Sequence, residues 1–126
     1  MNGLSAREIA ELFSAGKFTE VEKYLSEDIV WNIYEEKAIL TGKKSVMEFM
    51  KKTGEYFKTV TTKFETFGIL EDNDKVAIYG RAEFIRGSKT VNTVYSCDIY
   101  IFSPLGQIKK IHSYSNSSRL QINPGK

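Results

Sequence analysis

The chain contains few residues that could form cross-links or mark a boundary between domains. Among its 126 residues there is one cysteine, Cys97, together with two prolines and one histidine. A lone cysteine cannot form an intrachain disulfide, which excludes a disulfide-stapled secreted domain. Pro104 and Pro124 fall in turn or tail sequence, and no linker or internal repeat is present. We therefore expect one domain that spans residues 1–126.

The chain also lacks a strong charge excess and a long apolar run. Its 18 basic and 16 acidic residues give a net charge of +2, whereas dedicated nucleic-acid binders usually carry a strongly basic face. No run approaches the roughly 20 apolar residues that span a bilayer, and no signal peptide follows Met1. The sequence therefore predicts a cytoplasmic protein that binds neither nucleic acid nor membranes.

Residues that bind metals or phosphates are scarce as well. One histidine and one cysteine, without a cluster of partners, do not make a zinc site. Thr41-Gly42-Lys43-Lys44-Ser45 resembles the end of a phosphate-binding loop, but Lys37 stands where that loop needs a glycine. We therefore expect no metal and no cofactor.

Apolar and aromatic residues, in contrast, are plentiful, at 41% and 13% of the chain. They are sufficient to form a core or to line a cavity. Ser5 and Glu8 form a capping box that begins a first helix with an apolar stripe. Thr19 and Glu22 predict a second capping box and a shorter helix whose apolar face continues through Val21, Tyr24 and Leu25. A third helix is predicted over 42–57, where apolar residues recur at spacings of three and four.

Alternating β-branched and aromatic residues predict the strands, with tight turns between the later ones. The predicted strands cover 29–34, 59–70, 75–85, 90–102 and 107–115, and 35–41 is predicted to be a connection. The element order is therefore α-α-β-α-β-β-β-β. This order predicts an α+β fold in which N-terminal helices pack on one face of an antiparallel sheet.

Short motifs at the element boundaries resemble those of a known superfamily. They are Ala15-Gly16-Lys17-Phe18, Glu27-Asp28-Ile29-Val30-Trp31, Thr41-Gly42-Lys43 and Gly106-Gln107-Ile108. Their order and spacing resemble the nuclear-transport-factor-two-like superfamily, which is also called SnoaL-like or ketosteroid-isomerase-like. The resemblance implies a cystatin-like cone, with a curved sheet wrapped by helices and a pocket at the open end. It also implies a homodimer formed through the outer face of the sheet. Because the superfamily includes isomerases, cyclases, hydrolases, binding proteins and transport adaptors, the fold does not fix the function.

Asp98 is the candidate site residue with the clearest chemistry. It lies within a predicted strand, where an acid costs several kcal/mol unless it is paired, hydrogen-bonded or protonated. A carboxyl group in an apolar pocket has a raised pKa and can donate a hydrogen bond near neutral pH. The resemblance places an acid on this strand, which implies that Asp98 is an acid or an oxyanion donor. The alternative is a surface acid on the outer face of the sheet.

Other residues of the isomerase pattern are missing. The resemblance places the general base near Ile33 and a helical tyrosine near Ile9, and neither aliphatic side chain can transfer a proton. Where other branches often end the closing strand with an aspartate, this sequence has Asn116, whose amide cannot act as a base. Steroid isomerisation by that mechanism is therefore not expected, and epoxide hydrolysis is disfavoured.

His112 is the other candidate for acid–base chemistry, because the pKa of an unperturbed histidine lies near neutrality. It could pair with Asp98 across neighbouring strands, or it could lie on the outer face of the sheet. Aromatic side chains that offer an apolar body, and in most cases a hydroxyl, are candidate pocket residues. They are Trp31, Tyr34, Tyr56, Tyr100 and Tyr114, which could equally belong to the core or to an interface.

Three functional hypotheses follow. The first is a homodimeric SnoaL-like protein that binds an apolar small molecule in an apolar pocket with few polar groups. The second is an isomerase, cyclase or dehydratase that uses Asp98, assisted by His112 or a tyrosine. The third is an interaction module with a filled cavity.

Overall fold

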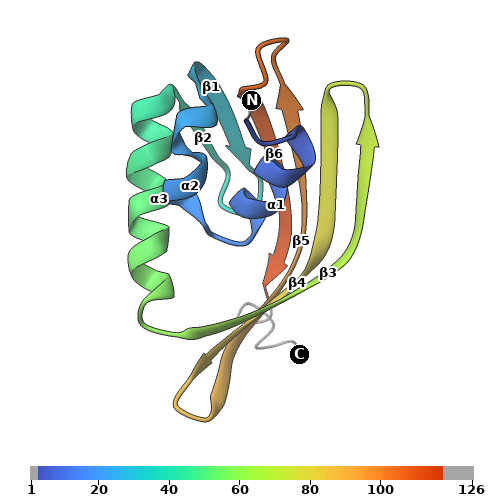
Figure 1. The fold of residues 1–126 in the computed structure, drawn as a ribbon. Coiled ribbons are helices and arrows are strands. Elements are labelled where there is room, and N and C mark those ends of the chain that lie inside the picture. Colours follow the sequence, from blue (N-terminus) through green and yellow to red (C-terminus); the bar gives the residue numbers. More distant parts are fainter. Residues whose placement is uncertain (1–2, 118–126) are drawn as a thin grey trace.

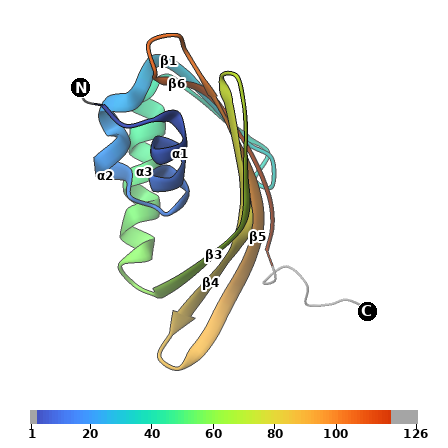
Figure 2. The same cartoon turned by 45° about the vertical axis from the view of Figure 1, so that its right-hand side comes forward.

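The computed structural model describes residues 3–117. Its helices are α1 (Ala6–Ser14), α2 (Phe18–Val21), the 3-10 helix η1 (Glu22–Tyr24) and α3 (Lys43–Phe57). Its strands are β1 (Leu25–Ile33), β2 (Ala38–Thr41), β3 (Thr61–Asp72), β4 (Lys75–Arg86), β5 (Lys89–Phe102) and β6 (Ile108–Ser117). The strands form one sheet in the order β2-β1-β6-β5-β4-β3 (Figure 1). The sheet is strongly curved, and the helices lie on its concave side (Figure 2). The predicted α+β cone is therefore confirmed.

The sheet differs from the prediction in two respects. It is mixed rather than antiparallel, because β1 and β6 run parallel, with Trp31 opposite Ile111. The segment predicted as a connection contains β2, which pairs antiparallel with β1. A turn with Lys37 at a φ of 54° joins these two strands. Side-chain alternation carries no information about strand direction, and a strand of four residues is too short to alternate clearly.

The first capping box is confirmed, and the second is wrong. Ser5 accepts a hydrogen bond from the backbone of Glu8, whose side chain accepts one from the backbone of Ser5. Helix α2 begins after Lys17 without a side-chain cap and lasts only 4 residues before η1 takes over. The chain is then already in β1 at Leu25, which was predicted to be helical.

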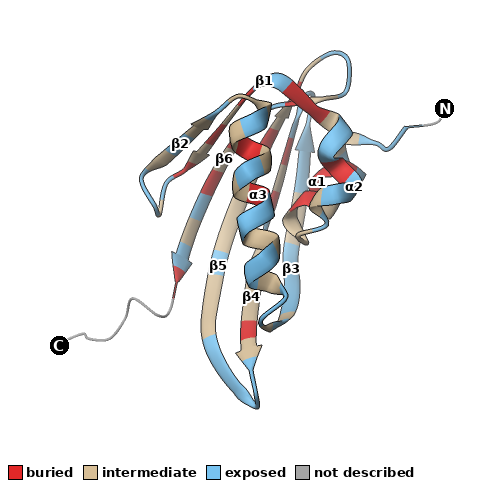
Figure 3. Ribbon diagram, turned by 90° about the vertical axis from the view of Figure 1, so that its left-hand side faces the viewer, coloured by how far each residue is buried: buried red, intermediate tan, exposed pale blue. Residues whose placement is uncertain are grey.

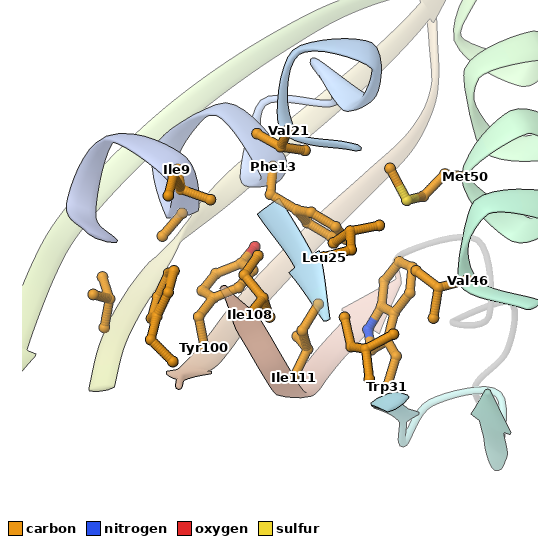
Figure 4. Packing of buried hydrophobic residues seen from close by; sticks show 14 of the residues in the cluster. Ile9, Phe13, Val21, Leu25, Trp31, Val46, Met50, Tyr100, Ile108 and Ile111 are labelled. Atoms are coloured by element: carbon orange, nitrogen blue, oxygen red, sulfur yellow. The ribbon is translucent and has the colours of Figure 1, made fainter. Parts of the chain in front are cut away.

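The hydrophobic core lies between the helices and the concave face of the sheet. The ring of Phe13 in α1 makes edge contacts with Trp31 and Tyr100, at centroid distances of 5.2 and 5.5 Å. Val46 and Met50 complete the core from α3 (Figure 4). Burying a large apolar side chain stabilises a fold by about 1.5–3 kcal/mol, so this cluster anchors α1 and α3 to the sheet. Most of the length of α3 is exposed or half-buried (Figure 3).

A β-bulge contributes to the curvature of the sheet at the point where the hollow described below is formed. The pairing of β3 with β4 shifts between Thr66 and Gly68, opposite Gly80 and Tyr79. Any Cβ at Gly80 would overlap the carbonyl oxygen of Glu65 and lie 3.0 Å from the Cα of Thr66. Only glycine therefore allows the two backbones to approach this closely.

Candidate functional site

A hollow of about 290 Å³ lies between the C-terminal end of α1 and the concave side of β3, β4 and β5. Its apolar lining includes Ala15, Phe64, Ile78 and Ala82, and its polar lining includes Glu11, Ser14, Thr66, Ser96 and Asp98. The hollow is thus of mixed polarity, whereas an apolar pocket with few polar groups was expected from the sequence. It is the place where the described chain brings a partly buried carboxyl group next to apolar walls.

Asp98 reaches this hollow because of its place in β5. Tyr100, two residues further on, is fully buried in the core, so alternation turns Asp98 toward the same concave side. Asp98 lies opposite Ser113 of β6, and the side chains of the two residues are hydrogen-bonded. The prediction that Asp98 faces a pocket, and not the outer surface, is consistent with this geometry.

A hydrogen-bond chain extends from Asp98 into the core. Nε1 of Trp31 donates to Oγ of Ser113 over 2.8 Å. Because an indole N–H can only donate, the hydroxyl of Ser113 accepts from Trp31 and turns its own hydrogen toward Asp98. Trp31 therefore orients Ser113 from within the core, behind Asp98, and does not line the hollow.

The carboxyl group of Asp98 has an unusually high pKa. Burial raises its pKa from the usual 3.8 to about 6, and the hydrogen bond from Ser113 offsets part of that rise. Near neutral pH both the protonated and the ionised forms of this carboxyl group are therefore populated. When protonated it can donate a hydrogen bond into the hollow, and when ionised it can only accept.

His112 does not join Asp98. His112 lies opposite Ile99 in the register, one position away from Ser113, and a shift of one residue turns a side chain to the other face. On the outer face its Nδ1 lies 2.8 Å from the hydroxyl oxygen of Tyr34, and the two rings are stacked. The Asp98–His112 pair considered from the sequence is therefore not formed.

None of the candidate aromatic residues lines the hollow in the described part of the chain. Tyr100 is buried in the core with Trp31, and Tyr56 of α3 packs its ring against Phe84 at 5.7 Å. Tyr34 and Tyr114 stack on each other at 4.6 Å on the outer face. These residues were predicted to line a pocket because of their residue type, but alternation alone does not say which face of a curved sheet a residue occupies.

Helix α1 contributes two side chains to the hollow that were not predicted from the sequence. Glu11 and Ser14 lie three residues apart beside the buried stripe of Ile9, Ala10 and Phe13, so the helix directs them toward the edge of the core. Glu11 lies 3.8 Å from Arg7 and is solvent-accessible. The spacing of Glu11 and Ser14 was the one sequence feature that could have indicated this role. The same spacing also occurs on a helix face that is exposed to solvent.

Two other hollows lie elsewhere. A groove of about 880 Å³ between α2 and α3 has an apolar floor that includes Phe18, Met47 and Met50, and a rim of mixed lysines and glutamates. A shallower hollow of about 410 Å³ lies on the outer face of the sheet. The glutamates that line the groove are all exposed, and no carboxyl group of residues 3–117 lines the outer hollow. Over residues 3–117 no three His, Cys, Asp or Glu side chains cluster to hold a metal, and no helix could cross a membrane.

Residues 6–111 match the model of the family described as SnoaL-like domain. A solved NTF2-like protein of unknown function from Cytophaga hutchinsonii is 28% identical, with a TM-score of 0.75 over 87% of this chain and 95% of that one. A putative SnoaL-like polyketide cyclase from Shewanella denitrificans is 13% identical, with a TM-score of 0.69 over 88% and 90% of the two chains. An LEH-like epoxide hydrolase from M. tuberculosis is 17% identical, with a TM-score of 0.67 over 88% and 82%.

The last two proteins share the fold with this chain at low identity, so their activities do not transfer to it. No match is found among curated proteins. The family match, in contrast, covers most of the sequence and agrees with the element order and the curved sheet. The chain belongs to the SnoaL-like domain family.

Proposed function

We propose that this protein binds a small, mainly apolar molecule in the hollow at Asp98, and that the molecule presents one polar oxygen to that carboxyl group. The observation that carries the proposal is the position of Asp98 in the lining of the hollow, where burial raises its pKa to about 6. A carboxyl group in such a position costs stability, and such costs are typical of functional sites. The apolar walls would hold the body of the ligand, and Asp98 would orient it.

The volume limits the size of the ligand. At about 290 Å³, the hollow lies at the lower end of the range of small-molecule sites, roughly 300–1,000 Å³. A compound with a single ring fits this size better than a steroid does. Acetophenone, a ring with one carbonyl group, is therefore a suitable probe, and ethylbenzene is its matched control without the oxygen.

We expect acetophenone to bind more tightly at pH 5 than at pH 8, by about tenfold. Protonated Asp98 donates to the carbonyl oxygen, whereas ionised Asp98 repels it, and a hydrogen bond of about 1.4 kcal/mol corresponds to a factor of ten. Chemical-shift titration of the ¹⁵N-labelled protein measures this affinity. Asp98→Asn should abolish the pH dependence, and ethylbenzene should show none. Equal acetophenone affinity at both pH values would contradict the proposal. A thermal-shift screen of ring-containing metabolites would then search for the natural ligand.

The second candidate function is an enzyme of the isomerase, cyclase or dehydratase type. It is favoured by one observation: Glu11 lines the same hollow as Asp98, so a second carboxyl group is available as a base. Glu11 would remove a proton from the carbon next to a carbonyl group, while Asp98 would donate a hydrogen bond to the oxygen that gains the negative charge.

Exchange with solvent separates the two candidates. An enzyme of this kind should replace the methyl protons of acetophenone with deuterium in D₂O faster than buffer does, as measured by loss of the ¹H signal. Glu11→Gln should return the rate to that of buffer, whereas Glu8→Gln on the same helix should not change it. A binding protein should show no exchange above buffer.

The outer face of the sheet supports a proposal about assembly. Tyr34, Phe67, Tyr79, Tyr95 and Tyr114 are each between 41% and 50% exposed, and we call them the outer aromatic patch. The last four of these line the shallow hollow on this face. Exposed apolar patches of this kind mark interaction surfaces, and we propose that a second copy of the chain covers this one.

Sedimentation equilibrium at micromolar concentration should accordingly give the mass of a dimer. Tyr95→Lys would place a charge within the outer aromatic patch and should yield a monomer. Leu105→Lys, at a position that is 87% exposed in the turn between β5 and β6, should leave the dimer intact. A wild-type monomer at that concentration would refute this assembly.

A further inference from the structure

Two serines near the hollow share an arrangement: each has an aromatic hydrogen-bond donor behind it. Trp31 lies behind Ser113, as described above. Behind Ser14 lies Tyr100, whose hydroxyl oxygen is 2.6 Å from Oγ of Ser14. The first serine supports Asp98, whereas the second lines the hollow itself. Ser14 plays no part in the function proposed so far.

The burial of Tyr100 decides the direction of its hydrogen bond. Tyr100 is 1% exposed, so its hydroxyl hydrogen needs an acceptor within the protein. Within residues 3–117, the partner found for that hydroxyl is Ser14, and no buried polar side-chain atom is left without a partner. Tyr100 therefore donates to Ser14. The hydrogen of Ser14 is then free to point elsewhere, and the half-buried side chain of Ser14 opens onto the hollow.

We propose that Ser14, oriented by Tyr100, is a second hydrogen-bond donor of the hollow, and that Ser14 and Asp98 together select an uncharged ligand with a carbonyl oxygen. The proposal rests on the function proposed above, because it assumes that a ligand occupies this hollow. A carbonyl oxygen has two lone pairs and can accept from both donors at once. Because Ser14 already accepts from Tyr100, its remaining role toward a ligand is mainly that of a donor.

A neutral ligand suits the groups around the hollow better than an ion does. Glu11 from α1 lies at the edge of the hollow and disfavours an anion. Arg81 from β4 lies opposite Tyr95 in the register, so its guanidinium group, 2.8 Å from the carboxylate of Glu65, belongs to an ion pair on the outer face of the sheet. Glu11 would attract a cation, but a cationic group offers no acceptor to the hydroxyl hydrogens of Ser14 and protonated Asp98. A neutral ketone, aldehyde or lactone fits both donors and the apolar walls.

The test uses the titration with acetophenone and ethylbenzene on the full chain at pH 5. Ser14→Ala should weaken acetophenone binding by about threefold to tenfold, the range for one neutral hydrogen bond, and should leave ethylbenzene binding unchanged. Ser96→Ala is the matched control. Ser96 lines the same hollow but has no aromatic donor behind it, and its loss should change acetophenone binding by less than about twofold.

Two further variants guard against a structural effect of losing the partner of Tyr100. Ser14→Thr keeps a hydroxyl group and should restore acetophenone affinity. Tyr100→Phe removes the hydrogen bond to Ser14, so the hydroxyl group of Ser14 can rotate. This variant should weaken acetophenone binding by about twofold to threefold and leave ethylbenzene binding unchanged. The ¹⁵N spectrum of each variant reports whether the fold is retained.

The outcomes separate this inference from the function on which it rests. Wild-type affinity for acetophenone in Ser14→Ala, or an equal loss in Ser96→Ala, overturns the role of Ser14. If the pH dependence through Asp98 persists in that case, the proposed function stands alone. A wild-type protein that binds acetophenone no better than ethylbenzene overturns both.

Discussion

Asp98→Asn should make the protein about 3 kcal/mol more stable than the wild type at pH 8, and should have little effect below pH 4. The pKa of Asp98 is about 6 in the folded state against a usual 3.8, and each unit of difference corresponds to 1.36 kcal/mol. Below pH 4 the carboxyl is protonated in both the folded and the unfolded states, so it costs nothing. Between about pH 4 and pH 6 the unfolded chain releases its proton first, and the folded state loses stability.

Urea denaturation at pH 4, 6 and 8 measures this effect. The amide oxygen of asparagine can still accept the hydrogen bond from Ser113, so the substitution removes the charge and keeps the contact. Asp72→Asn, at an exposed position in β3, controls for the loss of a negative charge as such. A difference between Asp98→Asn and the wild type that stays constant from pH 4 to pH 8 would show that the carboxyl is not held in a buried site.

Gly80→Ala should destabilise the protein by about 1–3 kcal/mol, the cost of inserting an atom into a packed site. The new Cβ would overlap the carbonyl oxygen of Glu65 and press on the Cα of Thr66. Both are backbone atoms, so neither can swing aside as a flexible side chain would. Strands β3 and β4 would have to separate at the bulge, which also shapes the hollow at Asp98.

Gly54→Ala provides the matched control for this substitution. Gly54 lies in α3, and apart from its chain neighbours and the backbone of its own helix, no described atom would come within 4 Å of its Cβ. Alanine is favoured over glycine in a helix by about 0.5–1 kcal/mol, so this variant should be more stable than the wild type. Urea unfolding of both variants gives the comparison. Unfolding of Gly80→Ala at the wild-type midpoint would mean that the strands do not approach so closely at the bulge.

The two substitutions examine different contributions to one site. Gly80 allows the backbone of the sheet to bend, and the bend creates space between α1 and the strands. Asp98 places an ionisable group in that space at a cost to stability. The cost that Asp98 imposes on stability beside this hollow supports our proposal that a ligand uses the carboxyl group.

Much of the fold followed from local patterns. The capping box at Ser5, the apolar spacing of α3 and the alternation in β4 each depend on neighbours only a few residues away in the chain. The same is true of Asp98, since an acid within a strand signals a special environment wherever the strand lies. These features were therefore accessible from the sequence. The short strand β2 was not, because its evidence is its pairing with β1.

The sequence by itself determined the family and the main helices and strands, and it identified Asp98 as a candidate site residue. Only the tertiary structure decided which side chains meet. The register of β5 with β6 sends His112 to the outer face and places Ser113 beside Asp98, and the packing of α1 brings Ser14 to the hollow. The physical reason is that alternation says which residues share a face, whereas the curvature and partners of the sheet decide which face encloses a cavity.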